Sequence, residues 1–132
     1  MTSTSPAVAI APENNYFTTI NIFRTTPAHQ EELTQVLLRG MHLLDRQSGF
    51  VATSLHRSHD GERVVAYVQW ESREAFEAMR SRPDAQGHFE SVGHLVSSVD
   101  AVACQVTFSH DRPEPSLRSD HAESPEEPSC AQ

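Results

Sequence analysis

The most informative run for the fold is GFVATSLHRSHDGERVVAYVQWES, Gly49–Ser72. Apolar and polar residues alternate in two runs within it, 50–57 and 63–70, which is typical of strands with one buried face. Between the runs, the dipeptide Asp60-Gly61 favours the tight turn of a β-hairpin. The pattern therefore predicts two antiparallel strands joined by a short loop.

The length of the hairpin loop sets which residues face each other. A two- or four-residue loop places Leu55 opposite Ala66 and Val51 opposite Trp70, whereas a three-residue loop shifts this register. Alternation also predicts that one face of the second strand carries Val64, Ala66, Val68 and Trp70. Trp70 is the only tryptophan of the chain. Such an indole is either core or dimer packing, or part of a ligand pocket.

Similar patterns predict the elements on either side of the hairpin. Alternating runs predict a strand at 16–24 and another at 100–108. Thr26 and Pro27 predict a helix start, because a hydroxyl N-cap is followed by proline at the first helical position. Apolar residues then recur at helical spacing, and Gly49 is expected to end this helix.

A second helical region follows the hairpin in two pieces. Ser72 is a candidate cap for a short helix over 73–80. Pro83 separates this helix from another that begins near Asp84. The predicted order is β-α-β-β-α-β, which is typical of the ferredoxin-like α+β fold, an antiparallel sheet with helices on one face.

The face of this sheet away from the helices needs cover, because its apolar side chains would otherwise meet water. Its candidate residues are Ile20, Ile22, Val65 and Tyr67. A domain of this size often completes its core by association. We therefore expect a homodimer in which a second sheet covers this face, giving a dimeric α+β barrel.

Composition limits the domain and its partners. The ends 1–15 and 111–132 bury too little apolar surface to offset chain entropy and are predicted to be disordered, which leaves one domain at 16–110. The formal net charge of −8 argues against nucleic acid as a partner, and the absence of lysine excludes Schiff-base chemistry through a side chain. Cys104 and Cys130 are too few for a disulfide framework. No apolar run or leader pattern suggests a membrane, so we expect a cytoplasmic protein.

Three side chains are candidates for chemistry in a pocket between the sheet and the helices. Asn21 shares a strand face with Phe17 and Phe23, and it is either a satisfied core amide, part of a bulge, or a donor to a ligand. His88 lies on the inward stripe of the last helix, where it is either bonded to a carbonyl or able to accept a proton near neutral pH. Trp70 is the third. The histidines show no ligand spacing, so no metal is expected.

The run that ends in QWES, together with FTTINIFR, EAFEAM and PDAQGHFE, resembles the antibiotic biosynthesis monooxygenase family, whose members are small, dimeric and ferredoxin-like. In this resemblance Trp70 matches the tryptophan of the family's pocket. Members that oxidise anthrone-type polyketides carry an asparagine at the position of Ala66, and tyrosines are common where this chain has Phe76 and Cys104. Three polar groups expected near the pocket are therefore absent.

The resemblance implies a monooxygenase that acts on an anthrone- or angucycline-like aromatic polyketide intermediate in antibiotic biosynthesis. Dioxygen is then the co-substrate. It is activated either by the substrate's own anion without a cofactor, or by reduced flavin (FADH2 or FMNH2) with oxidative cleavage of a ring carbon–carbon bond as one outcome. A non-oxidative polyketide cyclase and a non-catalytic ligand-binding dimer remain alternatives.

The same resemblance suggests roles for individual residues. Trp70, Asn21 and His88 are the expected catalytic residues, the first two as hydrogen-bond donors to a developing oxyanion and His88 in proton transfer. Without an asparagine at position 66, oxyanion stabilisation should be weaker by about 3 kcal/mol unless Asn21 replaces that donor. The residues expected to contact substrate are Phe17, Phe23, Leu55, Ala66, Phe76, Met79 and Val92.

Overall fold

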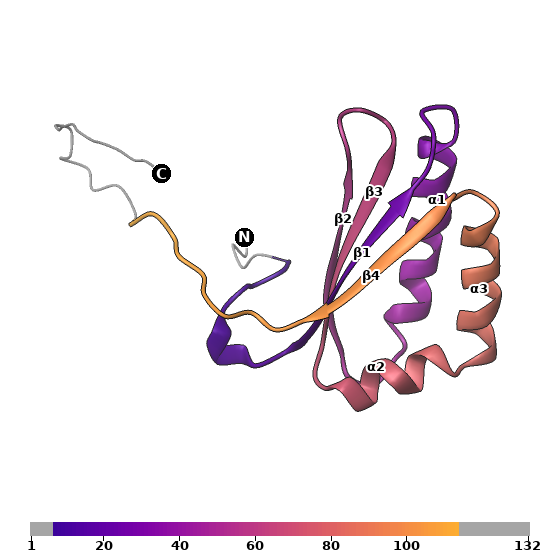
Figure 1. Ribbon diagram of the computed structural model, residues 1–132. Coiled ribbons are helices and arrows are strands. Elements are labelled where there is room, and N and C mark those ends of the chain that lie inside the picture. The colour runs from indigo at the N-terminus through magenta and orange to yellow at the C-terminus, as the bar shows by residue number, and fades with distance from the viewer. Residues whose placement is uncertain (1–6, 114–132) are drawn as a thin grey trace, which may run out of the picture.

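The computed structural model describes residues 7–113 (Figure 1). Residues 1–6 and 114–132, which belong to the two segments predicted to be disordered, lie outside the described residues. Within 7–15, the short 3₁₀ helix η1 spans Pro12–Asn14, and the carbonyl of Ala9 accepts a hydrogen bond of 2.9 Å from Gln69 Nε2. The domain limits at 16 and 110 stay predictions.

Four strands form one antiparallel sheet in the order β2-β3-β1-β4. The strands are β1 Phe17–Arg24, β2 Phe50–Arg57, β3 Arg63–Trp70 and β4 Ser98–Cys104. The hairpin strands β2 and β3 have the bounds that alternation predicted. The last strand was expected at 100–108, and this was wrong at both ends: β4 pairs only with β1, and that pairing ends where Cys104 meets Thr18.

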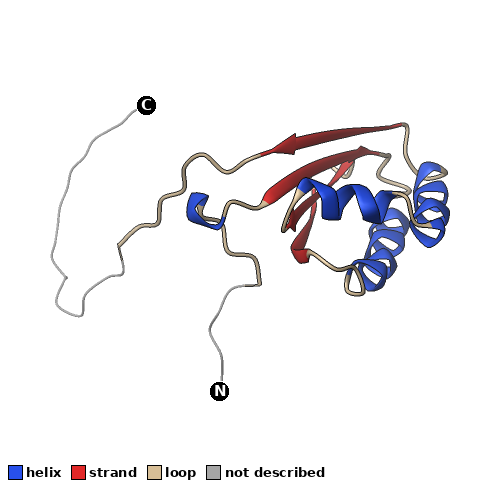
Figure 2. Ribbon diagram, turned by 90° about the horizontal axis from the view of Figure 1, so that it is seen from below, coloured by secondary structure: helices blue, strands red, loops and turns tan. Residues whose placement is uncertain are grey.

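Three helices lie on one side of the sheet (Figures 1 and 2). They are α1 Gln30–Leu44, α2 Arg73–Arg80 and α3 Pro83–Gly93. The Ser72 hydroxyl caps α2 as predicted, since Oγ accepts the Ala75 N–H at 3.1 Å. The arrangement confirms the ferredoxin-like α+β fold. None of the helices within residues 7–113 is long and apolar enough to cross a membrane.

The predicted ends of the first helix were wrong. His29, not Thr26, is the N-cap residue of α1, because the Thr26 carbonyl accepts the His29 N–H at 2.9 Å and closes a turn before the helix begins. The helix ends at Leu44, before the expected stop at Gly49. The intervening residues form a turn that leads into β2.

The hairpin has the four-residue loop, 59–62, that the register argument allowed. The Ser58 N–H donates to the Arg63 carbonyl at 3.0 Å, and Leu55 faces Ala66 as predicted. The second predicted pair differs, because an irregularity between Phe50 and Ala52 displaces the residue between them and leaves Phe50 opposite Trp70. The cavity-facing side of β3 is unaffected by this shift.

The sheet face away from the helices is only partly covered. Ile20, Val65 and Tyr67 are half-buried there, and Val102 of β4, which pairs with Ile20, is 42% exposed. Thr18 and Gln69 at one end of this face are buried. Among the described residues the Thr18 Oγ1 is the only fully buried side-chain nitrogen or oxygen without a hydrogen-bond partner.

Candidate active site

A cavity of about 400 Å³ lies between the helix-facing side of the sheet and the three helices. Its walls come from β1, β3 and β4 below and from α1, α2 and α3 above, and they are mainly apolar. The floor includes Asn21 and Phe23 of β1 and Ala66, Val68 and Trp70 of β3. This combination of an apolar enclosure and a few polar groups is typical of small-molecule sites.

Trp70 forms one end of the cavity. Its side chain is 1% exposed and packs edge-on against Phe50 and Phe76, with ring centroids 5.7 Å and 6.1 Å away. No described residue accepts a hydrogen bond from the indole N–H. The indole nitrogen is nevertheless not one of the fully buried side-chain atoms that lack a hydrogen-bond partner among the described residues. Because Trp70 lines the cavity, this N–H is a candidate donor to a molecule bound there.

Asn21 lies directly opposite Ala66 across the β1–β3 ladder. Side chains paired in this way have Cβ atoms about 4.5–5.5 Å apart on the same face. The amide is half-buried at the cavity surface, and no described residue is hydrogen-bonded to it. An amide that β3 lacks at Ala66 is thus present on the adjacent strand.

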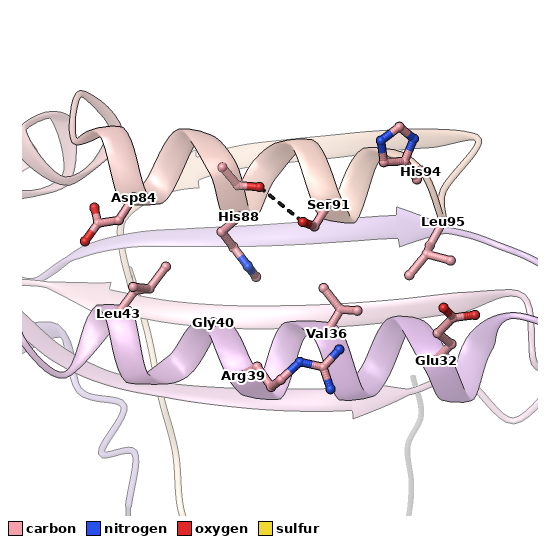
Figure 3. A pocket seen from close by; sticks show the side chains of 11 residues that line it. Glu32, Val36, Arg39, Gly40, Leu43, Asp84, His88, Ser91, His94 and Leu95 are labelled. Carbon is pink, nitrogen blue, oxygen red and sulfur yellow. Dashed lines mark hydrogen bonds between the residues drawn. The ribbon is translucent and has the colours of Figure 1, made fainter.

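His88 lies between the cavity and an outer groove of about 550 Å³ that runs between α1 and α3. Figure 3 shows its ring pointing from α3 towards Gly40 of α1. A Cβ at Gly40 would overlap the ring, with even the Nδ1 atom only 2.8 Å away. The absence of a side chain at Gly40 therefore leaves the space that the His88 imidazole occupies. Burial lowers the pKa of His88 below its ordinary value of 6.5, so the ring is neutral at pH 7.

The cavity brings together most of the residues that the sequence indicated. Eight of them line it: Asn21, Phe23, Ala66, Trp70, Phe76, Met79, His88 and Val92. Phe17 and Leu55 do not line it; Phe17 packs behind Phe76, with ring centroids 5.3 Å apart, and Leu55 packs against the buried core. Their predicted direct contact with a substrate stays a prediction, as do the roles of the other residues.

Sequence reasoning missed several polar residues of the cavity wall, namely Thr19, Gln47, Arg80 and Asp84. Two signals were available. Thr19 alternates with Asn21 on β1, and Arg80 follows Phe76 by one helical turn on α2. Gln47 lies in the turn after α1, where no periodicity indicates a direction. Within residues 7–113, no group of three His, Cys, Asp or Glu side chains is placed to hold a metal ion.

Comparison with known proteins agrees with this geometry. Residues 16–91 match the family model described as antibiotic biosynthesis monooxygenase. The chain belongs to this family. As a member it is an oxygenase, which confirms the enzyme class and the resemblance inferred from the sequence.

Individual members of the antibiotic biosynthesis monooxygenase family are similar over most of their length. Tetracenomycin-F1 monooxygenase of Streptomyces glaucescens is 39% identical over 101 residues, which cover 76% of this chain and 89% of that protein. The monooxygenase ActVA-Orf6 of Streptomyces coelicolor, solved with nanaomycin D, is 25% identical with a TM-score of 0.68, over 77% of this chain and 96% of that one. SnoaB of Streptomyces nogalater, a cofactor-independent oxygenase, is 25% identical with a TM-score of 0.61, over 76% and 99%.

Proposed function

We propose that this protein is a monooxygenase of an anthrone-like aromatic polyketide intermediate, and that the substrate's own anion activates dioxygen. One observation carries the proposal. The Trp70 N–H, the Asn21 amide and the His88 imidazole all border a single apolar cavity. Two relatives, a tetracenomycin F1 monooxygenase and a cofactor-independent oxygenase, support the substrate class and the mechanism.

The first step is removal of a proton from the substrate. His88 is suited to accept it, because burial keeps the imidazole neutral at pH 7 and the ring borders the cavity. A base that were already protonated at this pH would be inactive. An anthrone that loses its acidic C–H proton becomes an electron-rich anion with negative charge on oxygen.

The second step is stabilisation of that anion. Asn21 and Trp70 line the cavity from β1 and β3. The side-chain N–H groups of both residues donate a hydrogen bond to no described residue. In a cavity with mainly apolar walls, one such preorganised donor is worth about 3 kcal/mol in the transition state. Asn21 thereby supplies the donor that Ala66 does not.

Oxygen chemistry then follows from the anion itself. The anion transfers one electron to dioxygen, and the resulting radical pair combines to a peroxide anion, which takes the proton back from His88 and becomes a hydroperoxide. Loss of water from the hydroperoxide leaves a quinone, so one oxygen atom enters the product and the other leaves as water. The protein contributes an enclosure that limits the access of water, which protects the reactive pair.

A flavin bound in this cavity would have to share it with the substrate. About 400 Å³ lies near the low end of small-molecule sites, which run from about 300 to 1,000 Å³, and suits one tricyclic aromatic molecule. The described lining residues offer Arg80 as their one arginine, and no glycine-rich phosphate loop borders the cavity. The residues do not fit a substrate and a flavin together, so each step is assigned to side chains of this chain.

Oxygen consumption with anthrone as the surrogate substrate tests the proposal. We expect uptake with no added cofactor, and a large fall in the Trp70→Phe variant, which retains a ring and lacks the N–H. Thermal unfolding of this variant separates lost donation from lost packing. Uptake that appears only with FMNH2, above the flavin's own oxidation, would contradict the anion mechanism. Anthrone turnover under nitrogen would instead indicate a cyclase-type activity.

We also propose that two copies associate through the partly covered sheet face. Sedimentation velocity of the full chain at micromolar concentration should show a dimer. Ile20→Glu should shift it to monomer, because two buried charges would meet at a symmetric interface. Leu38→Glu is the matched control, since Leu38 is 44% exposed on the helix side. A monomeric wild type, or an equal effect of both changes, would contradict the dimer.

A further inference from the structure

Among the described residues that line the cavity, Arg80 is the only lysine or arginine. It lies in the last turn of α2, and its guanidinium is over the Phe76 ring, 5.5 Å from the centroid. Phe76 in turn packs against Trp70. Phe76 therefore contacts both the indole of the cavity wall and the positively charged guanidinium of Arg80.

Arg80 makes no strong ion pair with the described residues. The nearest carboxylate, Glu77, is 4.0 Å from Arg80 Nη1, and both side chains are more than half exposed, so this pair is weak. Asp84, the one carboxylate among the described residues of the cavity lining, is hydrogen-bonded to other groups. Its Oδ1 accepts from Arg82 Nε at 3.2 Å and from the Ala85 N–H at 2.9 Å, and the hydrogen bond from Arg82 lowers its pKa.

The rest of the protein would repel an acidic ligand. The formal net charge of the chain is −8, so an anion gains nothing from the overall field. A local cation at the edge of an aromatic wall is then the feature that distinguishes acids from neutral ligands. The planar guanidinium fork matches a carboxylate in a bidentate manner, which favours a carboxylate over a single phenolate oxygen.

We infer that Arg80 binds a carboxylate on the edge of the aromatic substrate, and that the substrate class is therefore an aromatic acid. The inference rests on the proposed function for the identity of the cavity as the substrate site. In this arrangement the ring system lies along Phe76. Its carboxylate meets Arg80, and its reacting edge lies nearer Trp70 and Asn21.

Binding of two matched probes tests the inference without any turnover. Anthraquinone-2-carboxylate and anthraquinone-2-carboxamide share a ring system and differ in charge. Because Trp70 is the only tryptophan of the chain, quenching of its fluorescence reports occupation of the cavity. At low ionic strength the wild type should bind the carboxylate about tenfold more tightly than the carboxamide, a preference that salt weakens.

Variants of Arg80 and Arg73 test which residue causes the preference for the carboxylate probe. Arg80→Met should make the two probes bind equally, and Arg80→Lys should keep part of the preference, because it retains the charge and loses the fork. Arg73→Met is the matched control: Arg73 also lies over an aromatic ring, Phe17, at 4.9 Å, but it does not line the cavity. This variant should keep the full preference.

Three results would overturn the inference: no preference in the wild type, a preference that persists in Arg80→Met, or an equal loss in Arg73→Met. The outcome is independent of oxygen consumption. A preference for the acid in a protein that consumes no oxygen would leave the Arg80 site standing and remove the oxygenase proposal. Oxygen consumption without a preference for the carboxylate would support the oxygenase proposal and overturn the Arg80 inference.

Discussion

Replacing Asn21 with alanine is expected to lower kcat for anthrone oxidation at least 100-fold, the usual cost of one oxyanion donor. Because Ala66 carries no amide, Asn21 is the asparagine side chain through which the cavity lining reaches the developing charge. Stability should change little, since no described residue is hydrogen-bonded to this amide. Steady-state oxygen uptake and thermal unfolding of the same samples measure both effects.

An amide donor should also be effective at position 66 on β3, the strand paired with β1. Asn21 and Ala66 are direct partners in the β1–β3 register, so the double variant Asn21→Ala/Ala66→Asn moves the donor across by about 5 Å on the same face. We expect it to recover much of the lost turnover. Thr18→Ala is the control on β1, because Thr18 points to the other face of the sheet and should leave turnover unchanged. Normal activity in the single variant would exclude Asn21 as a donor. A double variant as slow as the single one would exclude exchange between the strands.

Gly40→Ala is expected to lower kcat at least tenfold by displacing the His88 ring. The added Cβ overlaps the imidazole, which lies at the end of a side chain and borders the outer groove, so we expect the ring to move in that direction. The backbone of α1 need not move, and alanine raises helix propensity by up to about 1 kcal/mol relative to glycine. The expected result is a folded protein whose base is misplaced, with a loss within the range of general-base catalysis.

The pH profile distinguishes this displacement from a general defect. In the wild type, kcat should rise as His88 loses its proton, with a midpoint below 6.5 because burial lowers its pKa. A ring displaced into the groove is better solvated, so its pKa rises and the acid limb of kcat moves to higher pH. Gly87→Ala is the matched control, since a Cβ there meets nothing within 4 Å. An unshifted acid limb in Gly40→Ala would show that another group is the base.

The Ala66 position illustrates how far sequence reasoning reaches. The resemblance identified a missing amide, and alternation placed Asn21 on the same type of face as Phe23. That the two positions face each other depends on the pairing of β1 with β3, which are separated by α1 and β2 in the chain. Hydrogen bonds between distant segments set this register, and no local period specifies it.

Where the signal is local, the residue pattern was enough to place an element. The Asp60-Gly61 turn and the alternation around it set the bounds of β2 and β3, and Ser72 set the start of α2, because each depends only on residues a few positions apart. Which side chains meet in the cavity became clear from the packing of the folded chain. The packing of α1, α2 and α3 on the sheet places the His88 ring against Gly40. The same packing brings Arg80 and Phe76 together at the cavity wall. Such packing is set by shape and volume across elements, which a one-dimensional pattern does not contain.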